Sequence, residues 1–589
     1  MSVGTQLLPS PQTEPLEVAN ARLLGWKGFA YTVLLGCAIN ILAYGFQYGR
    51  DNHFFELAMV NWLRDPGLYP GDPIREGFAR FPTIFWKIVA SVPQRIDIEW
   101  TLAFFFLLTK ILFFAGVVRI VRWSTSDMRF ARIVVVLFAL SPALNARAPF
   151  GGAYVLDPTQ THTPLAIALL VCAGAALLEG RWVAASAIGA VALYFSAPYA
   201  IYMLFAFAAL AVLDWSAKKA NIIAAGFVGV VLSVPFVVIN HAHVTGKFPA
   251  DYIQALLFFY PAHLTLGGHR LIPVLAGLAF LAATMGAVVW MHLRGASCDR
   301  HLEVMTVSFV IPVLVGALAG QFFLTPQIAN FQLMRADAFL LLYSALLLLV
   351  SIYYLRRDGL LPFPAVSLPL AVLFFAAPRD WPRLALLALG LSLALWSELR
   401  KWITTARRWL RNRRLRPSMS RGIEAGVGLI IVMLCGAIFF LAARSWSGRE
   451  RFSIPSQRED AWMGLQRWAR LNTPEDAVFL VPTDVEGFRV SSRRSSWGEW
   501  KDGMAVYLYP PFADVYLERM REVGWQAPPD LRVPGVLRQQ YESQPWESLL
   551  SIAHRNHLQF IVQYTEVRYP VQPVYSNPEF SVYGVGASR

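Results

Sequence analysis

The sequence predicts a polytopic α-helical membrane protein of about thirteen transmembrane helices, followed by a small C-terminal α/β domain outside the membrane. Three observations predict this. Of the 589 residues 56% are hydrophobic, and the mean hydropathy is +0.45. Apolar segments near the ~17–25 residues that cross a bilayer recur between residues 28 and 443. The segment 445–589 is instead polar and rich in Trp, Tyr, Arg and Pro. The composition therefore excludes a soluble enzyme.

The distribution of Lys and Arg predicts the orientation of these segments. Basic residues gather in every second loop, most densely in 400–421, and cytoplasmic loops carry such an excess. We therefore expect the N-terminus inside and the C-terminal domain outside. The expected spans lie near 28–47, 100–121, 131–146, 164–179, 182–197, 199–213, 222–240, 271–291, 304–323, 337–355, 362–377, 382–397 and 424–443. The segment 182–213 is alternatively one long helix that is broken at Pro198.

The chain then divides into three parts by its predicted topology. They are a cytoplasmic N-terminal tail (1–24), a transmembrane domain (25–444) with a long first outer loop (48–99), and an extracytoplasmic domain (445–589). In the last part, short apolar runs at 477–481, 558–562 and 580–585 predict strands, and 456–470, 515–523 and 546–554 predict helices.

Charge and cysteine content narrow the function classes. The net charge of +14 is typical of nucleic-acid binding in a soluble protein, but here it marks cytoplasmic loops, so no nucleic-acid partner is expected. The four cysteines are scattered and show no CxxC spacing, which supports neither a zinc site nor a disulfide framework.

The first outer loop is the most informative segment for chemistry. It opens with Tyr48-Gly49-Arg50-Asp51-Asn52-His53 and carries seven carboxylates. The apolar periodicity of 52–63 predicts a helix along the membrane interface, and 81–92 predicts a second short amphipathic segment. Asp51 stands where the first of these begins, so it is either an N-cap or a catalytic carboxylate at the lipid–water boundary.

This layout resembles the GT-C superfamily of polytopic membrane glycosyltransferases, and most closely a poorly characterised bacterial group within it. The matching motifs are G-x-D-N-H at Gly49–His53 and D-P-x-L-Y-P-x-D at Asp65–Asp72, and the shared layout runs from about residue 25 to the end of the chain. The resemblance implies a sugar donor linked to polyprenyl phosphate, a catalytic carboxylate at Asp51 and an arginine from a late outer loop on the lipid phosphate. Arg335 matches that arginine.

Other outer-loop residues are expected to bind the substrate. Asp157 precedes Pro158 and is either a turn residue or a ligand contact, and His53, His162 and His263 lie in predicted outer loops. Arg335 is a lone outer cation whose alternatives are snorkelling and a pair with Asp337. Four histidines in 241–269 make a divalent cation a possible cofactor, without a spacing that specifies a site. A basic aromatic strip over 493–501 suits sugar or phosphate.

The favoured function is a glycosyltransferase that passes a sugar from a polyprenyl-phosphate-linked donor to a glycan, lipid or protein acceptor at the outer face of a bacterial inner membrane. In it, Asp51 orients or deprotonates the acceptor hydroxyl, and Arg335, with His263 or His162, holds the phosphate. The alternatives are a transporter or flippase-like protein for lipid-linked glycans, and a catalytically inactive GT-C-like binding protein.

Overall fold

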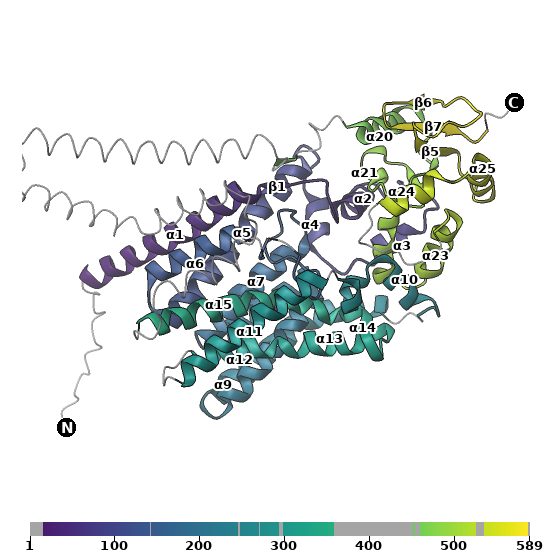
Figure 1. The fold of residues 1–589 in the computed structure, drawn as a ribbon. Helices are drawn as coiled ribbons and strands as arrows, with labels where there is room; N and C mark the ends of the chain where they lie inside the picture. The colour runs from purple at the N-terminus through teal and green to yellow at the C-terminus, as the bar shows by residue number, and fades with distance from the viewer. Residues whose placement is uncertain are drawn as a thin grey trace, which may run out of the picture.

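The computed structural model describes residues 16–357, 452–453, 460–525 and 535–586, apart from short gaps at 142, 146, 245–247, 270 and 294–298. Its helices form a long bundle, and a smaller C-terminal part sits against one end of it (Figure 1). The expected spans 362–377, 382–397 and 424–443, and the basic loop 401–421 between them, lie outside the described residues.

The chain is mostly helical, as its hydropathy predicted. The bundle contains α1 (Leu16–Tyr44), α5 (Ile98–Thr125), α6 (Met128–Leu140), α7 (His162–Leu178), α8 (Trp182–Phe195), α9 (Ala197–Val244), α11 (Leu271–Leu293), α12 (Arg300–Ser308), α13 (Val310–Phe322), α14 (Pro326–Phe331) and α15 (Asp337–Arg357). Within the described residues, six helical segments are long and apolar enough to cross a membrane, and α7 and α8 are shorter apolar helices. These observations support a polytopic membrane protein.

Two details of the segmentation agree with the expected spans. The spans 199–213 and 222–240 both carry the label α9, but the backbone of Lys218 between them is not helical (φ −129°, ψ 21°), so two helices meet there at a kink. Likewise, α8 and α9 are separate helices and not one long helix, because Ser196 between them has an extended backbone (φ −152°, ψ 101°). Pro198 therefore stands at the start of a new helix, where its missing N–H costs little, and not in the middle of a long one.

The first loop folds into short elements at the end of the bundle. After the two-residue strand β1 (Phe46–Gln47) come α2 (His53–Arg64), α3 (Ile74–Ala79) and α4 (Phe85–Ser91). Helix α2 coincides with the predicted interfacial helix, and its buried side carries Phe55 and Met59. Near the first loop lie α10 (Tyr252–Phe259) and the 3₁₀ turns η1 (Pro261–His263) and η2 (Leu266–Gly268), and a later 3₁₀ turn, η3 (Leu333–Ala336), contacts η1.

The C-terminal part contains a five-stranded mixed sheet. Its strands are β3 (Val478–Leu480), β4 (Ser495–Trp497), β5 (Phe560–Tyr564), β6 (Tyr575–Ser576) and β7 (Phe580–Gly584), in the order β4-β3-β5-β7-β6. Strand β3 pairs in parallel with β4 and β5, whereas β7 is antiparallel to β5 and β6. The predicted strands 477–481, 558–562 and 580–585 correspond to β3, β5 and β7.

Helices cover both faces of this sheet. On one face lie α20 (Ala461–Asn472) and α21 (Phe488–Ser492), and on the other α24 (Gly535–Glu542) and α25 (Trp546–Arg555). The elements η5 (Trp500–Gly503), α22 (Met504–Leu508) and α23 (Phe512–Glu522) pack mainly against the first loop and α10. Neighbouring strand residues point to opposite faces, so Phe479 packs in the cluster with α20 and Leu480 packs in the cluster with α25. The α20 cap is Asp460, whose Oδ1 accepts the Met463 N–H at 2.8 Å.

One apolar cluster joins the first loop to the C-terminal part. It combines Phe55 and Trp86 of the loop with Tyr252 of α10 and Phe512 and Tyr516 of α23. A second, short connection is the parallel pairing of β1 with β2 (Phe452–Ser453). In Figure 1, α2, α3 and α10 accordingly lie beside α21 and α23, although they are far apart in the sequence.

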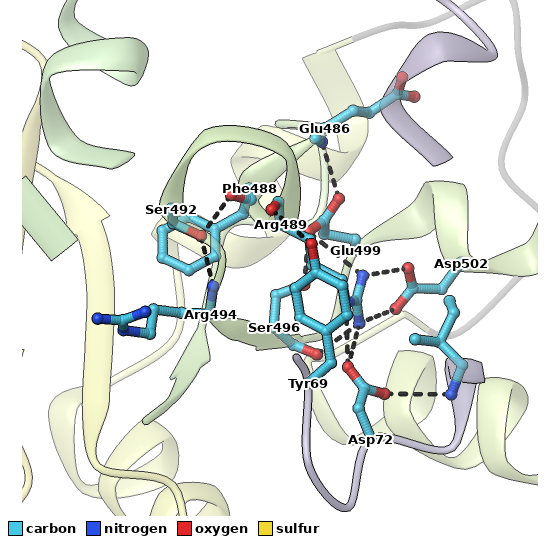
Figure 2. A network of polar contacts seen from close by, with 12 residues as sticks. Tyr69, Asp72, Glu486, Phe488, Arg489, Ser492, Arg494, Ser496, Glu499 and Asp502 are labelled. Carbon is cyan, nitrogen blue, oxygen red and sulfur yellow. Dashed lines mark hydrogen bonds and ion pairs between the residues drawn. The ribbon is translucent and has the colours of Figure 1, made fainter. Parts of the chain in front are cut away.

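A buried ionic cluster fixes the same junction. The Arg489 guanidinium donates to Asp72 of the first loop at 3.0 Å and to both Asp502 oxygens at 2.7 and 3.0 Å. Figure 2 shows these side chains converging, with Tyr69 donating to the Arg489 carbonyl at 2.9 Å. Glu499 completes the cluster 3.5 Å from Arg489. Since each partner comes from a different element, the cluster sets the position of the C-terminal part on the loop.

Candidate functional site

A cavity of about 630 Å³ lies where the bundle, the first loop and the C-terminal part meet. Its wall comes from the start of α2, the segment before α7, the first turn of α9, α10 with η1, α14 with η3, and α22. Apolar side chains, among them Phe248, Phe331 and Leu508, form much of the surface. The cavity therefore combines an apolar wall with polar groups, and the segments that line it are up to about 450 residues apart in the sequence.

Five of the six residues expected to act together line this cavity. They are Asp51, Asp157, His162, His263 and Arg335. They come from four separate segments of the chain, which the fold brings to one cavity.

The prediction for His53 is wrong, because this side chain is fully buried and lies outside the cavity wall. Its Nδ1 accepts the Gly49 N–H at 3.0 Å, and its Nε2 donates to the Gln160 carbonyl oxygen at 2.8 Å. Burial lowers the pKa of His53, in line with this neutral form. His53 thus links the start of α2 to the segment before α7 through hydrogen bonds. Its place in the G-x-D-N-H motif is therefore explained by this structural contact.

Asp51 is available to a ligand and is not a helix cap. The cap position of α2 is Asn52, no side chain caps the helix, and Asp51 contributes only its carbonyl, which accepts the Phe54 N–H at 3.2 Å. Its backbone is left-handed (φ 52°), a region in which an aspartate is tolerated better than most residues. The side chain is 48% exposed and lies 3.5 Å from Arg147 Nη2. Of the two roles that the sequence left open for Asp51, N-cap and catalytic carboxylate, the geometry is compatible with the second only.

Arg335 is a partly buried cation that pairs with no carboxylate among the described residues. Its Nη1 donates to the Gln332 side chain at 2.7 Å, and the guanidinium lies over the Tyr199 ring at 5.3 Å. The Nε atom is buried without a hydrogen-bond partner. The guanidinium therefore has donor capacity left for an anion.

Asp337 does not neutralise Arg335, contrary to one alternative from the sequence. Its Oδ2 instead accepts the N–H groups of Phe150 and Gly151, at 2.8 and 2.6 Å. This contact draws the 149–152 turn against η3, where a Cβ on Gly151 would collide with the Met334 carbonyl. The close approach requires glycine at this position.

Asp157 combines a turn role with a place in the cavity wall. Its Oδ1 accepts the Thr159 N–H at 2.8 Å, as a turn residue before proline does, and its carbonyl accepts from Lys110 Nζ at 3.0 Å. Burial raises the pKa of Asp157 to about 7, and the Asp51 charge acts in the same direction. Its carboxyl group is therefore half protonated near neutral pH.

The histidines of the cavity differ in their partners. His263 Nδ1 donates to the Gly151 carbonyl at 2.8 Å, and its ring packs on Tyr260 with centroids 4.2 Å apart. Burial, and next the Arg335 charge, hold the pKa of His263 well below its usual range. His263 is thus neutral and presents an acceptor at Nε2. His162 Nδ1 lies instead 3.2 Å from the Glu56 carboxylate.

Arg147 and Lys501 complete the site; Arg147 was not expected there from the sequence, whereas Lys501 ends the expected aromatic strip. Arg147 donates to the hydroxyl groups of Tyr154 and Tyr260 and pairs with Asp51. Lys501 is 7% exposed, and its charge opposes the rise that burial causes in the pKa of Glu486. Of the expected aromatic strip 493–501 only Lys501 lines the cavity, because Arg494 bonds to backbone carbonyls and Trp497 is buried in β4.

A signal for Arg147 was present in the sequence. Like Arg335, it is a lone basic residue in an expected outer loop, against the inside bias of Lys and Arg. Lys501 and the neighbouring Tyr507 carried no such signal, since only the docking of the C-terminal part brings them to the cavity.

The described residues do not specify a metal site. No three His, Cys, Asp or Glu side chains are grouped as ligands in this part of the chain. Of the expected histidine set, His263 and His269 contact backbone carbonyls, at 2.8 and 2.6 Å. The two carboxylates of the cavity, Asp51 and Asp157, remain the residues closest to what a divalent cation prefers.

One family model matches part of the C-terminal segment. Residues 460–521 match a model described as a domain of unknown function, DUF6798. This region contains Arg489 of the ionic cluster and Lys501 and Tyr507 of the cavity wall. No curated protein matches the chain.

Among solved structures, the chain is similar to ArnT from Cupriavidus metallidurans bound to undecaprenyl phosphate. The likeness has 12% sequence identity and a TM-score of 0.42, and it covers 96% of this chain and 98% of that chain. A likeness of this size establishes no fold, activity, substrate or family for the present chain. The functional case rests on the residues of the cavity.

Proposed function

We propose that the chain is a GT-C-type membrane glycosyltransferase that transfers a sugar from a polyprenyl-phosphate-linked donor to an acceptor. The observation that carries the proposal is the Arg335 guanidinium in the cavity wall, which forms no ion pair among the described residues and has a buried Nε without a hydrogen-bond partner. Arg147 and Lys501 line the same cavity; Arg147 is 3.5 Å from Asp51, and the Lys501 charge acts on Glu486. A guanidinium with free donors, beside two further cations, suits a phosphate.

The arrangement supplies what inverting transfer needs. Asp51 accepts the hydrogen bond of the acceptor hydroxyl and takes its proton as the oxygen attacks the anomeric carbon of the donor. The bond from that carbon to the phosphate oxygen breaks, and the guanidinium of Arg335 stabilises the charge that develops on the departing phosphate. Arg147, 3.5 Å from Asp51, holds the carboxylate in place and limits its rotation.

The apolar part of the wall suits a prenyl chain. Ile201, Phe248, Phe331 and Leu508 lie on the cavity surface, and bundle helices adjoin it. Under the proposed topology, with tail 1–24 in the cytoplasm and domain 445–589 outside, this cavity lies at the outer face of a bacterial inner membrane. A donor then enters laterally from the lipid, and the acceptor enters from the aqueous side.

A transporter for lipid-linked glycans and an inactive binding protein are the alternative functions. Both would use the cavity cations to hold a phosphate. Neither explains an aspartate held in a left-handed backbone at the cavity, with its side chain half exposed and an arginine alongside. Strained backbone of this kind concentrates at functional sites, which favours the enzyme.

Replacement of Asp51 by asparagine tests the enzyme proposal. Asp51→Asn keeps size and hydrogen bonding but removes the base, so sugar transfer from a polyprenyl-phosphate donor in membranes should fall by about 10²–10⁴-fold. The matched control is Asp65→Asn, an exposed acid of the same loop whose Oδ1 accepts only the Gly67 N–H. Full transfer activity in Asp51→Asn would contradict catalysis by this residue.

A further inference from the structure

Glu56 is a buried carboxylate directly behind the cavity wall. It lies on α2 with 0% of its side chain exposed, and its Oε1 is 3.2 Å from Nδ1 of His162. The contact is that of an ion pair, and among the described residues neither carboxylate oxygen of Glu56 nor Nδ1 of His162 has a hydrogen-bond partner. His162 is 15% exposed and lines the cavity, so it stands between the carboxylate and any ligand.

No other described group neutralises Glu56. His53, one turn earlier on the same helix, is neutral, because its Nδ1 accepts the Gly49 N–H and its Nε2 proton is given to the Gln160 carbonyl. Among the described ion pairs, the contact with His162 is the one in which Glu56 takes part. Glu56 and His162 therefore form an isolated pair.

The burial of Glu56 and His162 limits which of their atoms can carry protons. An uncompensated charge is strongly disfavoured in such surroundings, so the pair as a whole is held neutral. There are three neutral forms: a carboxylate with an imidazolium, a carboxylic acid that donates to Nδ1 of a neutral imidazole, and a carboxylic acid whose carbonyl oxygen accepts the Nδ1 proton. The third form leaves the acid O–H buried without an acceptor among the described residues, which is costly. In the two remaining forms Nε2 of His162 carries a proton.

We infer that Glu56 is a positioning residue that keeps a proton on Nε2 of His162, so that His162 donates a hydrogen bond to the phosphate of the cavity ligand. His162 and not His263 then serves the phosphate, because His263 gives its proton to Gly151 and presents an acceptor instead. The identity of the ligand as a phosphate rests on the proposed function; the position of the proton does not.

Diethylpyrocarbonate labelling reads the position of the proton without any transfer assay. The reagent acylates an unprotonated imidazole nitrogen, and mass spectrometry resolves the labelling of each histidine. At pH 7, His162 of the wild type should react slowly. In Glu56→Gln the side-chain amide can either donate a hydrogen bond to Nδ1 or accept one from Nδ1–H. The imidazole can then carry its proton on Nδ1 and leave Nε2 free to react, so labelling of His162 should rise at least about tenfold. His263 is the internal reference, and Glu76→Gln, on the exposed side of the same loop, is the matched control.

The ligand part is tested by binding of undecaprenyl phosphate. Glu56→Gln and His162→Gln should each weaken binding about tenfold, and the double variant should be no weaker than either, because the two residues act as one unit. Equal labelling of His162 in the wild type and Glu56→Gln, or none in either, would overturn the inference. A labelling contrast with unchanged binding would overturn its ligand part. If the labelling contrast appears but the wild type binds no polyprenyl phosphate, the proton assignment stands and the proposed function fails.

Discussion

Two clusters of charge lie at the junction between the first loop and the C-terminal part, and they differ in how their charges are satisfied. In the ionic cluster, Arg489 makes hydrogen bonds to Asp72 and Asp502 and lies near Glu499. In the cavity, Arg335 forms no ion pair among the described residues. Both clusters use arginine and both combine distant segments, but Arg489 is buried whereas Asp51 and Arg147 of the cavity are about half exposed.

The difference separates an anchor from a binding site. A guanidinium whose donors are all used by protein groups holds elements together and has nothing left for a ligand. A guanidinium with an orphaned Nε, beside a cavity of about 630 Å³, carries a cost that a bound anion removes. Asp72, an acid of the same loop as Asp51, belongs to the anchor and is not among the residues that line the cavity.

The largest effect on stability is expected at the anchor. Arg489→Met leaves Asp72 and Asp502 as buried carboxylates without their main partner, which typically costs about 3–5 kcal/mol. Arg335→Met removes an unpaired cation and should change the free energy of unfolding by less than about 1 kcal/mol. Chemical denaturation in detergent, followed by tryptophan fluorescence, compares the two. Equal destabilisation would mean that the cavity cation is structural as well.

A smaller effect, on turnover, is expected from Arg147. Arg147→Met removes the partner of Asp51 and the hydrogen bonds to Tyr154 and Tyr260, so the carboxylate loses its fixed orientation. Turnover should fall by about tenfold or more, while the donor concentration for half-maximal rate changes little. If only the donor concentration for half-maximal rate changed, Arg147 would instead bind the donor.

The smallest effect is a dependence of anion binding on pH. The pKa of Asp157 is raised by burial to about 7, so below pH 7 the group is mostly neutral and above it a negative charge enters the cavity wall. Anion binding by the wild type should therefore weaken as pH rises through 7, by about threefold relative to Asp157→Asn. The comparison with Asp157→Asn cancels the titration of the phosphate itself. A constant ratio of the two dissociation constants from pH 6 to 8 would contradict a titrating Asp157.

Local pattern predicted much of the fold. Hydropathy located the long helices, the amphipathic period located α2, and short apolar runs located β3, β5 and β7. The kink of α9 at Lys218 was also predictable, because Lys218 and Lys219 separate two apolar segments. The docking of the C-terminal part escaped prediction, since contacts between segments 400 residues apart leave no periodic trace.

The site was predictable where a residue stood out against its own surroundings. Asp51 opens an acidic loop, and Arg335 violates the inside bias of basic residues, and both line the cavity. His53 stood beside Asp51 in the motif but serves the backbone, and a motif alone does not separate the two roles. Glu56 looked like a polar residue of an interfacial helix, and only its complete burial against His162 reveals another role.

The central claim is that the cavity, and not the anchor, binds a lipid phosphate through Arg335. The most direct test is the dissociation constant of undecaprenyl phosphate for purified protein. Arg335→Ala should weaken binding by about 10–100-fold, and Arg335→Lys by less, because lysine keeps the charge but not the planar fork. Arg568→Ala, an exposed arginine of the C-terminal part, should bind like the wild type. Equal affinity for wild type, Arg335→Ala and Arg568→Ala would contradict the account.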